Sequence, residues 1–370
     1  MPQRLPSKPP VIAGMSYVNP LGAGGFADVF LYRQDMPARQ IAVKVLLATV
    51  VDAEVRRMFN AEADVLARLS SHPSILTIYQ ASISADGRPY IAMEYCPMSL
   101  GARYRQEKLA VPAVLDAGVR IACALETAHR AGVLHRDIKP SNILVTEFGN
   151  PVLSDFGIAA ALKGFEATAE AAMTVPWSAR EVLTGSTAGT IASEVWSLGA
   201  AVYSLLAGRS PFEQAGAGRN DRDQLIRRID KASYTPIGRT DVPAALEQVL
   251  VRSMERNPAK RYGSALEVAQ ALQATQAQLG LAVTPLDVPG DHWGTGEAVR
   301  LDDDQLRGAV RASVEYTSKR KPKPGKESLA AGGEKRRRGR RWPLVIGGVT
   351  AALLIAGGTV AVLILTGVLG

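Results

Sequence analysis

Residues 135–145 read His-Arg-Asp-Ile-Lys-Pro-Ser-Asn-Ile-Leu-Val, and an Asp-Phe-Gly triplet begins at Asp155 after a short segment that predicts a hairpin. Asp137, Lys139 and Asn142 thus precede a second acid at close spacing. Phosphoryl transfer needs a carboxylate at the acceptor hydroxyl, a cation near the moving phosphate and oxygen ligands for Mg²⁺. Two loop acids that only cap helices would not explain this joint spacing. The stretch therefore predicts a phosphoryl-transfer site.

A glycine-rich segment upstream predicts strand, turn and strand over residues 21–31. Glycine lets backbone approach phosphate oxygens without a Cβ in the way, although ordinary hairpins carry similar turns. No helical pattern follows at once, which argues against a Rossmann or P-loop reading. The candidate phosphate-binding positions are Leu21, Gly22, Ala23, Gly24 and Gly25.

Lys44 lies inside an apolar strand, residues 41–47, and is either on an exposed face or paired where it is buried. A partner is available in Glu62, which lies among the apolar positions of a helix predicted over residues 52–69. Such a pair would hold the α- and β-phosphates of a nucleotide. Further strands are predicted at 75–80 and 88–94, and helices at 113–132, 191–207, 222–231, 243–255 and 264–279.

These motifs resemble the Hanks-type serine/threonine protein kinases, in particular the membrane-anchored bacterial ones, from about Tyr17 to Leu272. The resemblance implies an α+β, bilobal protein kinase fold, with a β-rich N-lobe holding one main helix and a mostly helical C-lobe. The markers stand in the family's order: the glycine-rich turn, Ala42-Val43-Lys44, Glu62, His135-Arg136-Asp137, Lys139, Asn142 and Asp155-Phe156-Gly157.

The resemblance also implies the roles of these residues and the cofactors ATP and Mg²⁺ (or Mn²⁺). Asp137 would accept or orient the hydroxyl proton, Lys139 would lie near the γ-phosphate, and Lys44, held by Glu62, would bind the α- and β-phosphates. Metal would be held by Asn142 and Asp155. Adenine would bond the Glu94 carbonyl and the Cys96 amide, under Val29 and Ala42.

The sequence departs from the family at several positions. Ala27 replaces a glycine of the loop, Arg180 replaces the proline before Glu181, Met173 replaces a glycine, and Glu194 replaces an aspartate that supports the catalytic loop. We expect Arg261 to pair with Glu181. We expect the extra methylene of Glu194 to loosen the support of the catalytic loop. Glu194 and Arg180 are the only support for a second hypothesis, a membrane-anchored pseudokinase scaffold that binds ATP or partners without transfer.

The segment between Asp155 and Glu181 carries hydroxyls, and Arg136 beside Asp137 suggests control by a phosphate there. Thr168 is the expected autophosphorylation site and Thr174 the alternative, although Thr174 is also suited to a structural role near the acceptor.

The basicity of the chain is local. The net charge is +8, but residues 319–341 hold eleven Lys and Arg against two acids, a net of +9, so the remainder carries −1. The run directly precedes an uncharged stretch from Pro343 to Leu369, which is long enough for a transmembrane helix, although a buried globular helix is the alternative reading. This position favours anionic lipid headgroups over nucleic acid, which is not an expected partner.

The expected organisation is an N-terminal extension (1–16), a kinase domain (17–280), a juxtamembrane linker (281–341) and a transmembrane helix (342–369). By the positive-inside rule, the kinase domain is cytoplasmic, the protein is single-pass in the cell membrane and the C-terminus lies outside. Small residues every four positions, Gly348, Ala352 and Ala356, would let two copies pair as a homodimer, but such residues are also common in membrane helices. Protein substrates are the remaining expected partners.

Overall fold

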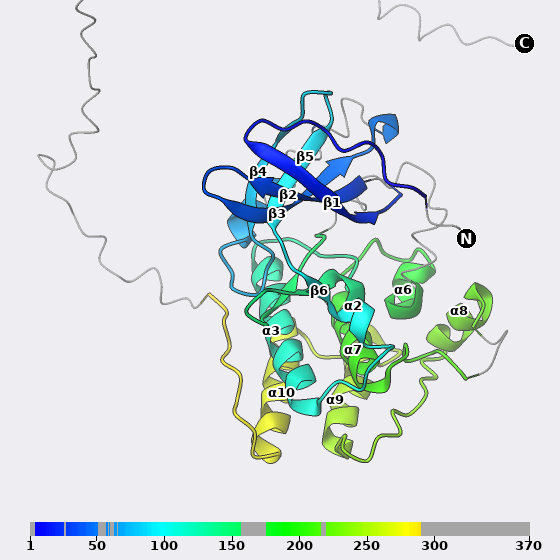
Figure 1. Cartoon of the computed structure of the whole chain (residues 1–370). Helices are drawn as coiled ribbons and strands as arrows, with labels where there is room; N and C mark the ends of the chain where they lie inside the picture. Colours follow the sequence, from blue (N-terminus) through cyan, green and yellow to red (C-terminus); the bar gives the residue numbers. More distant parts are fainter. Residues whose placement is uncertain are drawn as a thin grey trace, which may run out of the picture. The chain divides into compact units, whose positions relative to one another are not determined.

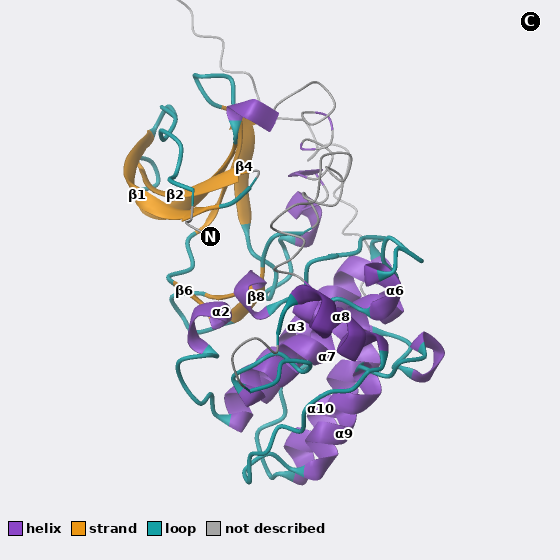
Figure 2. Ribbon diagram, turned by 90° about the vertical axis from the view of Figure 1, so that its right-hand side faces the viewer, coloured by secondary structure: helices purple, strands orange, loops and turns teal. Residues whose placement is uncertain are grey.

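The computed structural model describes residues 4–25, 27–50, 57, 59, 63–64, 66–156, 175–215 and 220–289. By internal contacts the chain divides into two units, 1–298 and 299–370, and all described residues belong to the first. That unit consists of a β-sheet lobe and a helical lobe, which Figure 2 shows as separate strand-rich and helix-rich parts. The bilobal α+β prediction is therefore confirmed for this part of the chain. The main N-lobe helix predicted over residues 52–69 lies mostly outside the described residues and stays a prediction.

The N-lobe is a five-stranded antiparallel sheet with the order β1-β2-β3-β5-β4. Its strands are β1 (Met15–Ala23), β2 (Ala27–Gln34), β3 (Arg39–Leu46), β4 (Ile78–Ile83) and β5 (Pro89–Glu94). The alternation along β2 and β3 separates two faces: Phe30 and Ile41 lie in one apolar cluster, whereas Ala27 and Leu46 lie in the other. The predicted strand at 75–80 was placed three residues too early.

The N-terminal extension packs on this sheet and is part of the lobe (Figure 1). The Tyr32 hydroxyl donates to the Pro10 carbonyl at 2.6 Å, and Ile12 is buried against Phe30 and Tyr32. Burying an aliphatic side chain of this size stabilises a fold by roughly 1.5–3 kcal/mol. We call residues 4–12 the N-terminal strap.

The C-lobe is built around α7 (Ile191–Ala207), which is buried on nearly every side and packs against α3 (Val111–Arg130), α9 (Ala244–Ser253) and α10 (Ala265–Gln278). Thr190 caps the start of α7, and Gly208 ends it in the left-handed conformation. These helices confirm the predicted ranges to within two residues. The shorter helices are α2 (Leu100–Arg103), α6 (Arg180–Leu183) and α8 (Arg222–Asp230), with 3₁₀ turns at Ala48–Val50, Pro140–Asn142, Val175–Trp177 and Pro258–Lys260.

A small sheet lies between α3 and the lobe boundary and carries the catalytic stretch. It consists of β6 (Met98–Ser99), β7 (Ile143–Val145) and β8 (Pro151–Leu153), in the order β6-β7-β8. The predicted hairpin after the catalytic loop is the β7–β8 pair. Leu76 N–H donates to the Leu153 carbonyl at 3.0 Å, which joins this sheet to the segment leading into β4.

Residues 281–289, predicted as the start of a linker, pack against the C-lobe. Thr284 donates to Asp116 on α3 at 2.8 Å, and the Arg130 guanidinium donates to the Pro289 carbonyl at 2.9 Å. The segment also reaches the loop before β4, where the His72 Nε2 lies 2.6 Å from the Asp287 carbonyl oxygen. It therefore ties the end of the folded unit to both α3 and that loop.

Among the residues described, no helix combines the length and apolar character needed to cross a membrane. The predicted transmembrane helix at 342–369, the basic run at 319–341 and the stripe of Gly348, Ala352 and Ala356 all lie outside the described residues.

Candidate active site

The catalytic loop is held by two buried side chains, His135 and Glu194. His135 Nε2 lies 2.8 Å from the Ser154 carbonyl, so this nitrogen carries the proton, and Nδ1 accepts from the Asp137 N–H at 3.2 Å. Burial lowers the pKa of His135, which keeps it neutral. Its ring also packs on Phe156, with ring centroids 4.6 Å apart.

Glu194 fixes the backbone directly before Asp137. Arg136 adopts a positive φ of 66°, which is costly for a residue with a Cβ, and its N–H donates to Glu194 Oε1 at 2.6 Å. The other carboxylate oxygen accepts from His129 Nε2 at 2.7 Å. Glu194 therefore contacts both the loop backbone and a buried histidine, so the expected loosening is not seen.

Asp137 lies at the centre of a polar cluster. Its Oδ2 is 2.8 Å from Lys139 Nζ and accepts from the Asn142 amide at 3.1 Å, while the same amide nitrogen donates to the Asp137 carbonyl at 2.7 Å. These contacts orient a partly exposed carboxylate toward solvent-accessible space beside a cation. Such a carboxylate can accept or orient a hydroxyl proton.

Asp155 faces Lys44, which comes from the other lobe. Lys44 Nζ lies 2.6 Å from Asp155 Oδ1. The Lys44 ammonium is the main reason that the pKa of Asp155 is lower than its ordinary value, so the carboxylate is ionised at neutral pH. Asp155 also has a positive φ of 58°. Asp137 and Asp155 share one site, because Asn142 contacts Asp137 and its carbonyl accepts from the Ser154 N–H at 2.9 Å.

The glycine-rich turn joins β1 to β2, and β2 pairs with β3, the strand that carries Lys44. Val29 on β2 pairs with Lys44 on β3, and Ala42 on β3 pairs with Leu31, so the predicted adenine-covering residues lie on the lysine's strand and on the strand beside it. A Cβ built on Gly22 would meet no atom of the described chain within 4 Å. Packing within the protein therefore does not require glycine here, which fits a backbone that must admit a ligand.

The predicted adenine contacts lie where β5 leaves the N-lobe. Glu94 ends β5, and Cys96 follows it before β6. Burial, with a smaller contribution from Glu94, raises the pKa of the Cys96 thiol to about 12. Cys96 is thus a neutral thiol and a poor nucleophile.

The donor set fits Mg²⁺ bound together with a phosphate ligand. Because the Asn142 amide nitrogen donates to Asp137, its amide oxygen is the atom left for a cation. Asp155 supplies an ionised carboxylate. Mg²⁺ is commonly held by one or two protein oxygens plus phosphates, and the residues described form no cluster of three or more His, Cys, Asp or Glu side chains that would hold a metal alone.

The remaining departures are accommodated by ion pairs. As predicted, Arg261 pairs with Glu181, at 2.6 and 3.1 Å. Arg180, where the family has proline, donates two hydrogen bonds to Asp230 at 2.8 and 2.9 Å. The platform around α6 is thus tied to α8 and to the end of the C-lobe.

Several predicted site residues cannot be placed. Glu62, Met173, Thr168 and Thr174 lie outside the residues that the structure describes, so the Lys44–Glu62 pair and the phosphorylation sites stay predictions.

Sequence reasoning missed three residues next to the site: His129, Arg4 and Asp28. His129 sits 65 residues before Glu194, and its contact with it is set by how α3 and α7 pack. For Asp28, a signal was present, since an acid directly follows the glycine-rich turn within an apolar strand.

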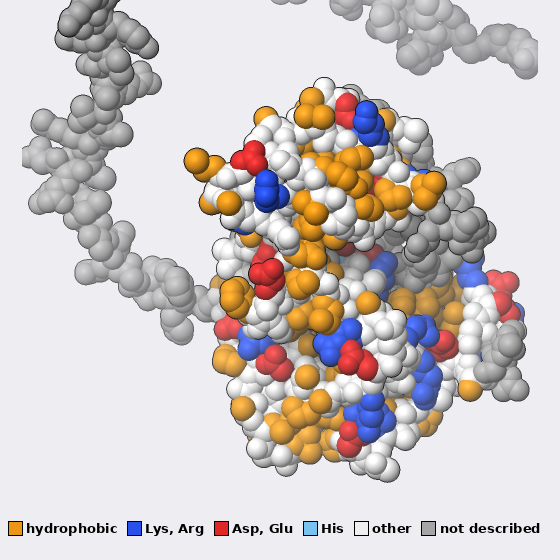
Figure 3. Space-filling model, in the orientation of Figure 1, with side chains coloured by type: hydrophobic (Ala, Val, Ile, Leu, Met, Phe, Trp, Pro, Cys, Tyr) orange, Lys and Arg blue, Asp and Glu red, His pale blue; other side chains and the backbone are white. Residues whose placement is uncertain are grey.

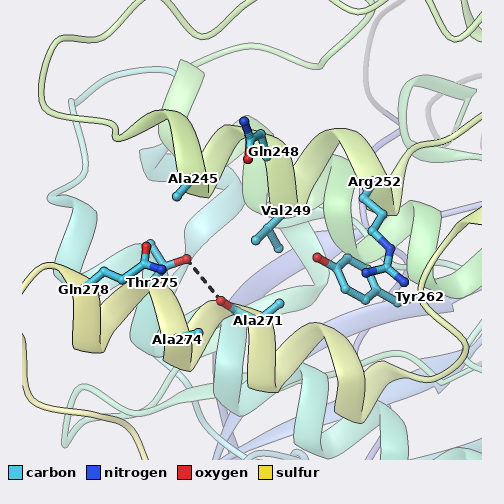
Figure 4. A pocket seen from close by; sticks show the side chains of 9 residues that line it. All are labelled: Ala245, Gln248, Val249, Arg252, Tyr262, Ala271, Ala274, Thr275 and Gln278. Atoms are coloured by element: carbon cyan, nitrogen blue, oxygen red, sulfur yellow. Dashed lines mark hydrogen bonds between the residues drawn. The ribbon is translucent and has the colours of Figure 1, made fainter.

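Two other surface features lie on the C-lobe. A shallow groove between α9 and α10 is lined by residues including Val249, Tyr262 and Arg252, whose guanidinium stacks on the Tyr262 ring at 4.2 Å (Figure 4). None of the predicted catalytic residues lines it. On the face shown in Figure 3, basic and acidic side chains of the C-lobe lie side by side, which agrees with the near-neutral charge outside residues 319–341.

Comparison with known proteins identifies the architecture. Residues 15–276 match the family model for the protein kinase domain. The chain is 39% identical over 280 residues to serine/threonine-protein kinase PknK of Mycobacterium tuberculosis, covering 75% of this chain and 25% of PknK. It is 36% identical to PknJ over 277 residues (71% of this chain, 46% of PknJ) and 34% identical to PknF over 273 residues (70% and 56%), both from the same organism. The chain therefore spans between a quarter and just over half of the length of these relatives. It belongs to the protein kinase family.

Proposed function

We propose that this protein transfers the γ-phosphate of ATP to Ser and Thr hydroxyls of cytosolic proteins at the inner face of the cell membrane. The observation that carries the proposal is the convergence of Lys44 on Asp155, across the two lobes, beside the cluster of Asp137, Lys139 and Asn142. The related serine/threonine kinases support the choice of acceptor.

In this proposal the chain's own residues position both reactants. Asp137 receives the acceptor hydroxyl and its proton, and Lys139 compensates charge on the group in transfer. Lys44 exchanges its contact with Asp155 for phosphate oxygens. Asn142 and Asp155 would hold Mg²⁺, which supplies neutralisation of charge on the β- and γ-phosphates when bound.

The contacts of Glu194 and Arg180 argue against the pseudokinase hypothesis. It depended on Glu194 and Arg180, but Glu194 bonds the Arg136 N–H at 2.6 Å and Arg180 is paired with Asp230. Glu194 thus supports the catalytic loop, and Arg180 is held by an ion pair.

The membrane part of the proposal depends on sequence alone. The uncharged stretch 343–369 would span the bilayer, and the basic run 319–341 would bind anionic headgroups on the cytoplasmic side. Autophosphorylation at Thr168, or at Thr174, would control activity through Arg136. Carbonate-resistant sedimentation with membranes tests the anchor, and phosphopeptide mapping after incubation with Mg-ATP tests the two threonines.

The transfer activity is tested on full-length protein with γ-labelled ATP, Mg²⁺ and a generic Ser/Thr protein substrate. We expect label on the substrate with wild type and with Asp35→Asn, an exposed acid in the turn after β2, but not with Asp155→Asn. Equal label with Asp155→Asn would mean that the activity belongs to a contaminant. Nucleotide binding without any transfer by wild type would refute the proposal in favour of a scaffold.

A further inference from the structure

The N-terminal strap ends beside the glycine-rich turn, where Arg4 contacts both of its sides. One Arg4 Nη donates to the Gly24 carbonyl at 3.0 Å and also pairs with the Asp28 carboxylate. The Asp28 carboxylate has a second partner in the strap, because the Ser7 N–H donates to its Oδ2 at 2.7 Å. Asp28 is fully buried, with an exposed fraction of 0%.

Gly24 and Asp28 are the residues that frame the turn. Ala23 at the end of β1 pairs with Asp28 near the start of β2, and the Gly24 N–H donates to the Ala27 carbonyl at 2.9 Å. Arg4 contacts both residues and therefore connects the two ends of the turn. It limits how far the turn can move as a unit relative to β2.

The rest of the strap is anchored to the sheet, so Arg4 does not reach the turn from a loose end. The Arg88 guanidinium donates to the Ser7 hydroxyl at 3.0 Å and to the Lys8 carbonyl at 2.7 Å. Further along, Tyr32 bonds the Pro10 carbonyl and Ile12 is buried. Residues 7–12 thus fix the point from which Arg4 extends.

The charge state of Asp28 agrees with this arrangement. Burial by itself raises the pKa of a carboxyl group, but the hydrogen bonds from Ser7 and the contact with Arg4 outweigh it, and the pKa of Asp28 is lower than its ordinary value. A buried carboxylate that stays ionised needs its cation, so Asp28 selects an arginine or lysine at this place in the strap.

We propose that Arg4 is a positioning residue for nucleotide binding, which acts through Gly24 and Asp28 to hold the glycine-rich turn in the conformation that receives the phosphates of ATP. Arg4 then belongs to the nucleotide-binding apparatus, although it precedes every recognised motif, whereas the Lys8 side chain has no part in it. The inference rests on the proposed function, because it assumes that the turn binds ATP.

The expected effect is moderate, because the Arg4 side chain is 42% exposed and its charge is screened by solvent. Losing a charge-assisted contact that orders the turn should weaken ATP binding about threefold to tenfold. The turnover number should change much less, since Asp137 and Lys139 belong to the other lobe.

Full-length Arg4→Gln, Arg4→Lys and Lys8→Gln proteins test this. Lys8→Gln is the matched control, because it removes a positive charge from an exposed side chain four residues along the same strap. Three quantities are measured on each: the Kd for Mg-ATP by calorimetry, KM and kcat for ATP, and hydrogen exchange of the peptide that covers residues 20–30. The melting temperature is recorded so that all measurements are made well below unfolding.

We expect Arg4→Gln to raise Kd and KM for ATP and to speed exchange in the turn. Arg4→Lys should show smaller increases in Kd, KM and exchange rate than Arg4→Gln, and Lys8→Gln should match wild type in all three. A lower melting temperature for Arg4→Gln with unchanged Kd and unchanged exchange would mean that the strap is only structural, and would overturn the inference. If wild type binds ATP but transfers no phosphate, the proposed function fails, while Kd and exchange still decide the role of Arg4.

Discussion

Replacing Glu194 by alanine should damage both stability and catalysis. Glu194 is 3% exposed and accepts from the Arg136 N–H and from His129 Nε2. Alanine leaves both donors buried without a partner, and each such donor costs roughly 1–3 kcal/mol. His129 Nδ1 is already buried without a hydrogen bond among the residues described, so the imidazole would lose its last partner. We expect a loss of about 3–5 kcal/mol in the free energy of unfolding.

The catalytic loss follows from the backbone. Arg136 is held at a φ of 66°, a conformation that costs a non-glycine residue about 1–3 kcal/mol, and the bond to Glu194 helps to hold it. Without that bond Asp137 should shift, and a misplacement of about 1 Å lowers the rate by on the order of 10².

Urea unfolding and kcat for a peptide substrate measure the two effects. Glu194→Gln is the matched variant. Its side-chain oxygen still accepts from the Arg136 N–H, so its free energy of unfolding should fall by only about 1 kcal/mol. Glu194→Asp, which restores the family's residue, should lie between Gln and Ala, because the shorter chain cannot reach both Arg136 and His129. An alanine variant within 0.5 kcal/mol and twofold in kcat of wild type would refute this reasoning, at the precision expected of such measurements.

Three further predictions concern the rest of the folded unit. Arg261→Ala removes a fully buried guanidinium from Glu181 and should lower the free energy of unfolding in urea by about 3–5 kcal/mol. Arg252→Ala loses an exposed contact with Tyr262 and should lower it by no more than about 1 kcal/mol. Equal losses for the two variants would contradict a buried ion pair between Arg261 and Glu181. Thr284→Val leaves the buried Gln276 amide without its acceptor and should cost about 1–3 kcal/mol, against no change for the exposed Thr240→Val; a neutral Thr284→Val would show that residues 281–289 do not pack as described. Folding lowers the pKa of Asp28, so the ionised carboxylate stabilises the folded protein at pH values above its ordinary pKa of 3.8. This stabilisation is lost as the pH falls through the pKa that Asp28 has in the folded protein. The stability difference between wild type and Asp28→Asn should thus be constant from pH 6 to 8 and shrink below about pH 4, and a difference that grew on acidification would contradict the ion pair.

The elements could be predicted because their signals are local. The helix predicted over residues 191–207 matches α7, and the structure adds that Thr190 caps its start. The apolar run around Lys44 predicted the strand β3, which the structure pairs with β2. The ion pair between Arg261 and Glu181 followed from the family's motifs, although the two residues are 80 positions apart.

The contacts that surround the site could not be predicted in the same way. His129 meets Glu194 only because α3 packs on α7, and Arg4 meets Asp28 only because the strap lies against the sheet. Neither pair has a spacing rule, and both depend on the packing of elements that are distant in sequence. The strap itself has a composition rich in proline, which predicts extended chain but not what the chain packs against.

The central claim is that Asp137 is the carboxylate that receives the acceptor hydroxyl. Single-turnover transfer from Mg-ATP to a Ser/Thr peptide, compared between full-length wild type, Asp137→Asn and the control Asp35→Asn, tests it most directly. We predict that Asp137→Asn lowers the transfer rate by about 10²–10⁴ while the Kd for ATP stays within twofold of wild type and Asp35→Asn is unchanged. An Asp137→Asn protein that transfers phosphate within twofold of the wild-type rate would contradict the account.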